Sequence, residues 1–347
     1  MKLMPDEYWM NRCLELAKMG TGNVSPNPMV GCVIVHENKI IGEGYHEKFG
    51  EAHAEVNAIN SVKDKSLLRE SMIFVTLEPC AHFGKTPPCA NLVADQNFKK
   101  VVIGSTDPNP KVNGQGIKII LDKGIEVVTS VLKEECDELN KRFFTFHTKK
   151  RPYIILKWAQ SQDGFMDIDR QNGEKGQFAI SQQETKAVVH KWRHEEAGIL
   201  VGRKTIENDD PKLDCRNYTG TNPIRIVLDP EEIITNDFRV INDGEKTIIV
   251  NTKTNSEVGN LKRIKVKNFT LDEILSRLHA ENMDSILVEG GRKTLDYFLK
   301  ENIWDEIRVI IGDKTIGKGQ EAPTLDSKPF RIQAIGKDNI LFYTNKL

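Results

Sequence analysis

The chain has 347 residues, which is enough for two domains of ordinary size. Its 49 Lys and Arg residues nearly balance its 50 Asp and Glu residues, so the overall charge does not favour binding to nucleic acid or an anionic membrane. No apolar run approaches the ~18 residues of a membrane span, and the N-terminal residues lack the apolar core of a signal peptide. We therefore expect a cytoplasmic protein with no nucleic-acid partner and no membrane partner.

The first half of the chain alternates between helical and strand patterns. Asp6 can cap a first helix, whose apolar residues Trp9, Cys13, Leu16 and Ala17 share one face. Strands are expected at residues 31–35, 39–44, 73–77, 100–105 and 125–129, and further helices after His53, from Pro87 and Pro88, at 116–123 and at 133–147. This alternation predicts a layered α/β domain with a central sheet.

A basic stretch at residues 148–151, followed by Pro152, marks the expected boundary between domains 1–148 and 149–347. In the second domain, Ser181 and Glu184 form a capping box for a helix that reaches about residue 196. Strands are expected at residues 153–157, 198–202, 224–229, 247–251, 286–289 and 307–312, and helices at 271–280 and from about 293. The pattern is again that of an α/β sheet domain.

Three pieces of the first domain indicate one chemistry: His53-Ala54-Glu55, Glu78-Pro79-Cys80, and Cys89. One His and two Cys give a tetrahedral zinc three ligands and leave the fourth position for water, which is the pattern of a catalytic site. The metal lowers the pKa of that water, so hydroxide is available near neutral pH. Glu55 is placed to carry protons from the water to the ring and to the leaving amine.

Each of these residues alone has an ordinary alternative, such as a helix-start histidine, a surface glutamate or a buried cysteine. The ordered set favours zinc, because His-x-Glu followed by Pro-Cys and a second Cys is the signature of zinc nucleobase deaminases. Residues two apart on a helix face opposite ways, so His53 and Glu55 can converge only at the irregular start of the helix.

Eight residues, 81–88, separate Cys80 from Cys89 where the common signature has two. The run from Glu78 to Cys89 resembles the deaminase domain of the bifunctional riboflavin-biosynthesis deaminase–reductases, as do the motifs Ser-Pro-Asn-Pro-Met-Val-Gly and Asp-Pro-Asn-Pro. The resemblance implies that a cationic inserted loop holds the substrate's ribose phosphate or ring, although Lys85 alone is also explained as a solvated loop lysine. The deaminase substrate residues that it implies are Asn27, His82, Lys85, Asp107 and Asn109.

The second domain lacks a Gly-x-Gly-x-x-Gly turn after an early strand, which argues against a Rossmann domain. It resembles instead the reductase domain of the same family, a dihydrofolate-reductase-like fold that uses NADPH. The matching segments are 157–164, 200–205, 209–216 and 288–291. The expected architecture is therefore a cytidine-deaminase-like α/β/α domain followed by a dihydrofolate-reductase-like α/β domain.

The resemblance also implies the residues of the reductase site. The substrate-binding residues would be Gln177, Arg193, Leu213, Arg216 and Glu289. The cofactor-binding residues would be Ala159, Ser161, Asp163, Ala179, Thr205, Asp209, Gly290, Gly291, Arg292 and Lys293. A glycine turn that opens a helix presents backbone N–H groups to phosphate, and a guanidinium matches phosphate oxygens, so the NADPH phosphates suit Gly290–Lys293 and the substrate phosphate suits Arg193 and Arg216.

The segment 176–181 departs from the family pattern. The family usually has a Trp where this chain has Ala179, and Phe178 stands beside it. Either the aromatic side chain has shifted by one residue, or a cofactor contact is missing.

The sequence predicts a bifunctional enzyme with the cofactors zinc and NADPH. Its first domain, a zinc-dependent hydrolase, would deaminate 2,5-diamino-6-(5-phosphoribosylamino)pyrimidin-4(3H)-one. Its second domain, an oxidoreductase, would reduce the ribosyl group to ribityl, and we expect a homo-oligomer. The alternatives are a nucleobase or tRNA deaminase with a non-catalytic C-terminal domain, and a chain whose second half is only a structural or oligomerising module; NADPH binding separates them from the main prediction.

Overall fold

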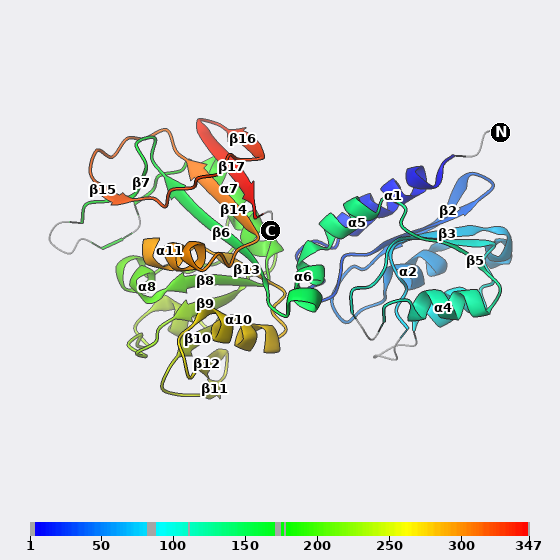
Figure 1. Ribbon diagram of the computed structural model, residues 1–347, viewed down its shortest axis with the longest axis horizontal. Coiled ribbons are helices and arrows are strands. Elements are labelled where there is room, and N and C mark those ends of the chain that lie inside the picture. Colours follow the sequence, from blue (N-terminus) through cyan, green and yellow to red (C-terminus); the bar gives the residue numbers. More distant parts are fainter. Residues whose placement is uncertain (1–3, 82–87, 110–111, 171–174, 177, 346–347) are drawn as a thin grey trace. The chain divides into compact units, whose positions relative to one another are not determined.

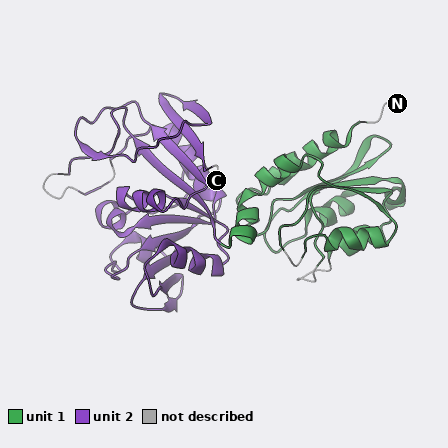
Figure 2. Ribbon diagram, viewed as in Figure 1, with its two compact units in different colours: residues 1–150 green, residues 151–347 purple. Residues whose placement is uncertain are grey.

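The computed structural model describes residues 4–81, 88–109, 112–170, 175–176 and 178–345 (Figure 1). The chain divides into two compact units, residues 1–150 and 151–347 (Figure 2). This division falls two residues after the boundary expected from the sequence. Within the described ranges, no helix is both long enough and apolar enough to cross a membrane.

Unit 1 contains a five-stranded sheet with the order β2-β1-β3-β4-β5. Strand β1 pairs antiparallel with β2 and β3, while β3, β4 and β5 run parallel. The strands are β1 (Gly31–His36), β2 (Lys39–Tyr45), β3 (Met72–Leu77), β4 (Lys100–Ser105) and β5 (Glu126–Val128). The helices are α1 (Asp6–Lys18), α2 (Ala54–Ser61), the 3-10 helix η1 (Lys65–Glu70), α3 (Cys89–Asp95), α4 (Gln115–Asp122), α5 (Lys133–Leu139) and α6 (Lys141–Lys149).

Apolar residues pack on both faces of this sheet because side chains of a strand point alternately to its two faces. Ile34 of β1 packs in one core cluster with residues of α2, α3 and α4, whereas Val33 and Val35 pack in another with residues of α1 and α5. Helix α1 lies directly on β1, since a Cβ added to Gly31 would meet the Cys13 carbonyl oxygen at 2.0 Å. The expected α/β/α layering is therefore present.

Two local predictions for unit 1 are wrong. Pro5, whose side chain makes no capping hydrogen bond, is the N-cap of α1; Asp6 is its first residue and forms an ion pair with Lys100 at 2.7 Å. The single helix expected at 133–147 is two helices that meet at Asn140. The Asn140 side chain accepts a hydrogen bond from the Met29 N–H (2.8 Å) and donates one to the Met29 carbonyl oxygen (2.9 Å). These contacts tie the helix break to the chain beside Asn27.

Unit 2 contains a ten-stranded sheet with the order β11-β12-β10-β9-β8-β13-β6-β14-β17-β16, and a two-stranded sheet of β15 and β7. The strands are β6 (Tyr153–Gln160), β7 (Phe165–Ile168), β8 (Gly198–Gly202), β9 (Ile224–Leu228), β10 (Thr247–Asn251), β11 (Ser256–Val258), β12 (Leu261–Lys265), β13 (Ser285–Val288), β14 (Glu306–Ile311), β15 (Gly319–Glu321), β16 (Arg331–Ile335) and β17 (Asp338–Thr344). The helices are α7 (Gln183–Glu195), α8 (Arg203–Asp209), α9 (Arg239–Asn242), α10 (Leu271–Ala280) and α11 (Arg292–Lys300).

The middle strands of this sheet, from β12 to β14, all pair in parallel. The outer strands β11, β17 and β16 pair antiparallel with their neighbours. Apolar residues of α10 and α11 pack in the largest core cluster, while those of α7 and of α8 and α9 lie in two other clusters. In a parallel sheet the loops after the carboxyl ends of the strands meet at one edge, where ligands bind. That edge holds the segments after β8, β9 and β13.

The capping box predicted for α7 is wrong. The N-cap is Gln182, and no side chain within the helix start caps it. Asp338, fully buried at the start of β17, instead accepts from the Gln182 N–H (2.8 Å) and from the Thr185 hydroxyl (2.6 Å). A carboxylate from a distant strand therefore satisfies the first turn of α7.

Candidate functional site

The three expected metal ligands converge in unit 1. His53 is the N-cap of α2, Cys80 follows β3, and Cys89 is the first residue of α3. The Nδ1 atom of His53 lies 3.6 Å from Sγ of Cys80 and 3.3 Å from Sγ of Cys89, and the three atoms all lie within 4.8 Å of one another. Tetrahedral zinc with usual bond lengths would separate a histidine nitrogen from a thiolate sulfur by about 3.6 Å. The geometry therefore fits a zinc ion.

The two thiols differ in their electrostatics. Hydrogen bonding from Cys89, and then from His53, lowers the pKa of Cys80. Cys89 donates that hydrogen bond and is buried, and both effects raise its pKa. One thiolate is thus already favoured in this pocket, and thiolate is the form that binds metal.

Glu55 lies beside this cluster in the first turn of α2 and is 3 % exposed. Burial, followed by the charge of Cys80, raises the pKa of Glu55 to about 7. His53 has extended backbone angles (φ −75°, ψ 165°) and so stands outside the helix proper. This is how two residues that are two apart in sequence share one site. A carboxyl group of this kind can take up and release a proton near neutral pH.

A buried histidine that sequence reasoning missed connects Asn27 to the cluster. The His46 ring packs edge-to-face against His53, with 5.2 Å between ring centroids. Burial lowers the pKa of His46, so the ring is neutral: Nδ1 donates to the Ala52 carbonyl oxygen (3.1 Å) and Nε2 accepts from the Asn27 amide (3.2 Å). His46 carries no recognisable motif, and only the fold brings it to this position.

The other expected substrate residues of unit 1 lie after β4 or outside the described residues. Asp107 is buried, and its carboxylate accepts from the Asn109 N–H at 2.7 Å. The Asp107 N–H donates to Glu78 at 3.2 Å. His82 and Lys85 lie outside the described residues.

In unit 2, Arg193 from α7 and Glu289 from the end of β13 meet as expected. Arg193 donates through Nε and Nη2 to the two carboxylate oxygens, each at 2.9 Å, and Lys157 of β6 lies 3.3 Å from the same carboxylate. Burial would raise the pKa of Glu289, but the charges of Arg193 and Lys157 outweigh it and hold that pKa well below its usual range. Burial also lowers the pKa of Lys157. Sequence reasoning gave no role to Lys157.

The loop with Leu213 and Arg216 contacts this ion cluster through Asp214. Leu213 is 3 % exposed and has a positive φ of 56°, which is uncommon for a branched residue and needs support from its surroundings. Arg193 donates to the Asp214 carbonyl oxygen at 2.9 Å. Arg216 is half exposed and forms an ion pair with the Asp214 side chain. Gln177 lies outside the described residues.

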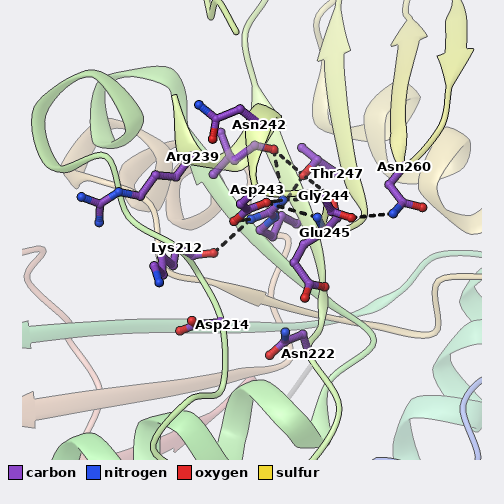
Figure 3. A network of polar contacts seen from close by, with 12 residues as sticks. Lys212, Asp214, Asn222, Arg239, Asn242, Asp243, Gly244, Glu245, Thr247 and Asn260 are labelled. Carbon is purple, nitrogen blue, oxygen red and sulfur yellow. Dashed lines mark hydrogen bonds and ion pairs between the residues drawn. The ribbon is translucent and has the colours of Figure 1, made fainter. Parts of the chain in front are cut away.

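A polar network supports the same loop at Lys212 (Figure 3). At its centre, the fully buried Arg225 donates to both carboxylate oxygens of Asp243, at 2.6 and 2.7 Å, and to the Lys212 carbonyl oxygen at 3.3 Å. Its Nε donates to the Thr247 hydroxyl at 3.0 Å. The network holds the chain that directly precedes Leu213.

Several of the expected cofactor residues meet at the start of α11. Gly291, the N-cap of α11, donates its N–H to the Thr205 hydroxyl at 3.1 Å. Gly290 is buried against Thr294. Arg292 pairs with Asp296 and donates to the carbonyl oxygens of Glu321 and Ala322, while Lys293 is exposed. A glycine turn therefore opens α11, as the sequence predicts, but the Arg292 guanidinium is already paired with protein groups.

The remaining expected cofactor residues lie near β6 and after β8. Asp163 accepts from the Ser161 hydroxyl (2.6 Å) and from the N–H groups of Ile316 and Gly317, which lowers the Asp163 pKa to about 2. Asp209 lies 3.6 Å from Arg170. Ala159 is half-buried within β6.

Ala179 is exposed, and its carbonyl oxygen accepts from the Lys314 ammonium at 2.7 Å. The same ammonium lies 5.6 Å from the ring centroid of Phe178. The aromatic side chain in this segment is therefore packed against a cation from the loop after β14.

Family models match both units. Residues 4–105 match the cytidine and deoxycytidylate deaminase zinc-binding region, and residues 152–341 match the RibD C-terminal domain. The chain is 38 % identical to the riboflavin biosynthesis protein RibD of Aquifex aeolicus, over 97 % of this chain and 98 % of that protein. It is also 38 % identical to the RibD of Bacillus amyloliquefaciens, over 93 % and 88 % of the two chains.

Solved structures resemble the whole chain. A diaminohydroxyphosphoribosylaminopyrimidine deaminase/5-amino-6-(5-phosphoribosylamino)uracil reductase from Thermotoga maritima is 35 % identical, with a TM-score of 0.87 and 97 % of each chain covered. The RibD of Acinetobacter baumannii is 29 % identical, with a TM-score of 0.88 and 98 % of each chain covered. The fold class predicted from the sequence is confirmed.

Proposed function

The chain belongs to the RibD family of riboflavin biosynthesis, and we therefore propose that residues 1–148 deaminate a phosphoribosylamino-pyrimidinone and that residues 149–347 reduce its ribosyl group. The protein is thus an enzyme with two activities that uses zinc and NADPH. The substrate of the deaminase is 2,5-diamino-6-(5-phosphoribosylamino)pyrimidin-4(3H)-one, and the reductase product is the corresponding ribityl compound.

In the deaminase, His53, Cys80 and Cys89 hold the metal. Bound zinc supplies a water of lowered pKa at this position. Glu55 accepts one proton from that water and passes it to the ring nitrogen. It then moves the second proton, from the hydroxyl group added to the ring carbon, to the amine that leaves as ammonia; a pKa of about 7 suits both transfers. Asn27, oriented by His46, holds the pyrimidine beside the metal, and Asp107 and Asn109 contact the sugar or the ring. We also assign His82 and Lys85 to the substrate phosphate.

In the reductase, NADPH supplies a hydride to C1′ of the opened ribose. Arg193 and Arg216 bind the substrate phosphate, with Gln177, Leu213 and Glu289 completing that site. Thr205, Asp209 and the Gly290–Lys293 turn, at the carboxyl edge of the sheet, would hold the cofactor together with Ala159, Ser161, Asp163 and Ala179. An aromatic contact from Phe178 would replace that of the tryptophan that the family usually has at the position of Ala179.

The observation that carries this function is the convergence of three metal ligands on a buried carboxyl group of raised pKa. It is tested by measuring the zinc content of the purified chain together with ammonia release from the pyrimidine and NADPH oxidation. We expect about one zinc per chain and both activities. A zinc-free chain, or one that releases no ammonia, would overturn the deaminase assignment, and a chain without NADPH oxidation would leave a deaminase with a non-catalytic second half.

Two further proposals concern the setting of the enzyme. We propose a cytoplasmic location, since the six cysteines, all within the described residues, are free thiols, as in a reducing compartment. We also propose that the enzyme is a homo-oligomer. Light scattering of the purified chain measures its mass and contradicts this proposal if the mass is that of one chain.

A further inference from the structure

Glu78 is a buried carboxylate with no assigned role. It stands between the end of β3 and the metal ligand Cys80, is 3 % exposed, and does not belong to the group of atoms that could bind a metal. Glu78 precedes Pro79 and the metal ligand Cys80 in one motif. Deamination already has Glu55 as its proton-transfer carboxylate, and its chemistry requires no second one at this point. Its contacts show what it does instead.

The Glu78 carboxylate accepts four backbone N–H groups from the segment after β4. One oxygen accepts from Asp107 (3.2 Å) and Gly114 (3.0 Å), and the other accepts from Gly116 (3.0 Å) and Ile117 (3.3 Å). Two of these donors belong to the first turn of α4, where N–H groups have no partner within the helix and a negative charge is favourable. Charge-assisted hydrogen bonds of this type are about twice as strong as neutral ones.

Close packing fixes the same segment against the metal motif. A Cβ added to Gly116 would lie 2.0 Å from the Pro79 carbonyl oxygen, so the start of α4 lies directly on the residue before Cys80. At the other end, Asp107 fixes Asn109 through the 2.7 Å hydrogen bond to its N–H. A single carboxylate therefore links the strand that carries a metal ligand to the loop that carries two expected substrate residues.

We propose that Glu78 is the positioning residue that sets the distance between the zinc and the substrate-binding residues Asp107 and Asn109. This inference rests on the proposed deaminase function. Glu78 acts through the backbone, and it touches neither substrate nor metal. Loss of its charge moves the substrate loop away from the metal and leaves the ligands His53, Cys80 and Cys89 in place.

The test compares Glu78→Gln and Glu78→Asp in the full-length chain. Glutamine keeps the size of the side chain, but it has one acceptor oxygen and turns an amide donor toward backbone donors. We expect Glu78→Gln to keep its zinc and to raise the KM for the pyrimidine about tenfold or more, as expected from the loss of charge-assisted contacts. Glu78→Asp keeps the charge and should recover part of this loss.

Two internal controls accompany the kinetics. The reductase activity of the same molecules should be unchanged, because its site lies in the other unit. Asp64→Asn is the matched control, since Asp64 also accepts a backbone N–H at a helix start (Ser66, 3.0 Å) but is exposed and remote in sequence from the metal motif. Hydrogen exchange supplies a readout besides activity: the amides of Asp107, Gly114 and Gly116 should exchange faster in Glu78→Gln and normally in Asp64→Asn.

The outcomes separate this role from the proposed function. Unchanged KM and unchanged exchange in Glu78→Gln, with a wild-type chain that releases ammonia, would overturn the role of Glu78 alone. Loss of zinc or of global stability in both Glu78 variants, with normal KM in the molecules that stay folded, would show a merely structural role. A wild-type chain that releases no ammonia would overturn the proposed function and this role with it.

Discussion

Arg193 donates hydrogen bonds from two nitrogens to the two carboxylate oxygens of Glu289, each at 2.9 Å. Lys157 donates to the same carboxylate at 3.3 Å. The side chains of Arg193 and Glu289 are only 11 % and 8 % exposed. Two cations therefore share one anion in a site with little water. The excess of positive charge suits an anionic substrate, and the carboxylate is needed to keep two buried cations together.

Glu289→Gln should destabilise unit 2 and remove part of its acid sensitivity. Removing one partner of a buried ion pair costs about 3–5 kcal/mol, because the other charge stays buried without compensation. The folded-state pKa of Glu289 is lowered, so its stabilising effect is complete above its unfolded pKa of about 4.3 and declines as the pH falls below it. Urea titrations of both proteins at pH 7 and from pH 5 to pH 3 measure the difference in free energy of unfolding.

We expect that difference to shrink by up to ~1.4 kcal/mol per pH unit below about pH 4.3. Glu184→Gln is the control, because Glu184 is an exposed carboxylate on α7. Parallel pH curves for wild type and Glu289→Gln would contradict the assigned pKa shift.

Two substitutions at the metal site should have opposite effects on zinc content. Glu55→Gln should keep the zinc but lower the deamination rate by about 10²–10⁴-fold, because the carboxyl group moves protons and is not a ligand. Cys80→Ser should lose the metal together with the activity. Metal analysis and ammonia release distinguish them, and Cys136→Ser, a buried cysteine outside the metal cluster, should keep both. Zinc loss in Glu55→Gln would contradict its role.

The three candidate zinc ligands could be found from the sequence because each lies in a short motif with a fixed order, and the structure brings them together. His46 and Glu78 could not, since their roles depend on backbone groups that come from distant segments of the fold. The same limit applies to the reductase, where the resemblance gave Arg193 and Glu289 but not Lys157, which needs the register of β6 beside β13.

The elements that were missed have weak local patterns. Residues of β16 are almost all exposed, so no buried apolar face marks this short strand, which is defined by its pairing with β17. The helix break at Asn140 was missed because its cause is a pair of hydrogen bonds to Met29, 111 residues earlier. The capping of α7 was wrong for a similar reason, because Asp338 competes for the first turn from the far end of the chain.

That competition is testable. Asp338→Ala should cost about 1–2 kcal/mol or more, because it leaves the Gln182 N–H and the buried Thr185 hydroxyl without their acceptor. Ser181→Ala should change the free energy of unfolding by less than about 0.5 kcal/mol, since Ser181 does not cap α7. Equal losses in the two variants would restore the capping box.

Arg216 and Phe178 should act on different ligands of the reductase. Arg216 is half exposed and forms an ion pair with the Asp214 side chain beside it, so its guanidinium can reach a phosphate without breaking the core. Losing a charge-assisted contact costs about 1.5–3 kcal/mol, which weakens binding roughly ten- to a hundredfold. Arg216→Ala should therefore raise the KM for the pyrimidine phosphate and leave NADPH affinity nearly unchanged.

Phe178→Ala should weaken NADPH binding and leave the KM for the pyrimidine phosphate nearly unchanged, if Phe178 has taken over the role of the tryptophan that the family usually has at the position of Ala179. The ring is only half-buried and lies 5.6 Å from the Lys314 ammonium, so part of it remains accessible to a cofactor. If the ring only anchors the Lys314 loop, Phe178→Ala loses stability and keeps its NADPH affinity. Titration of NADPH against both variants, with thermal unfolding alongside, decides between these roles. Weaker NADPH binding in Arg216→Ala, together with normal binding in Phe178→Ala, would reverse both assignments, because the arginine would then face the cofactor and the aromatic ring would face only the protein.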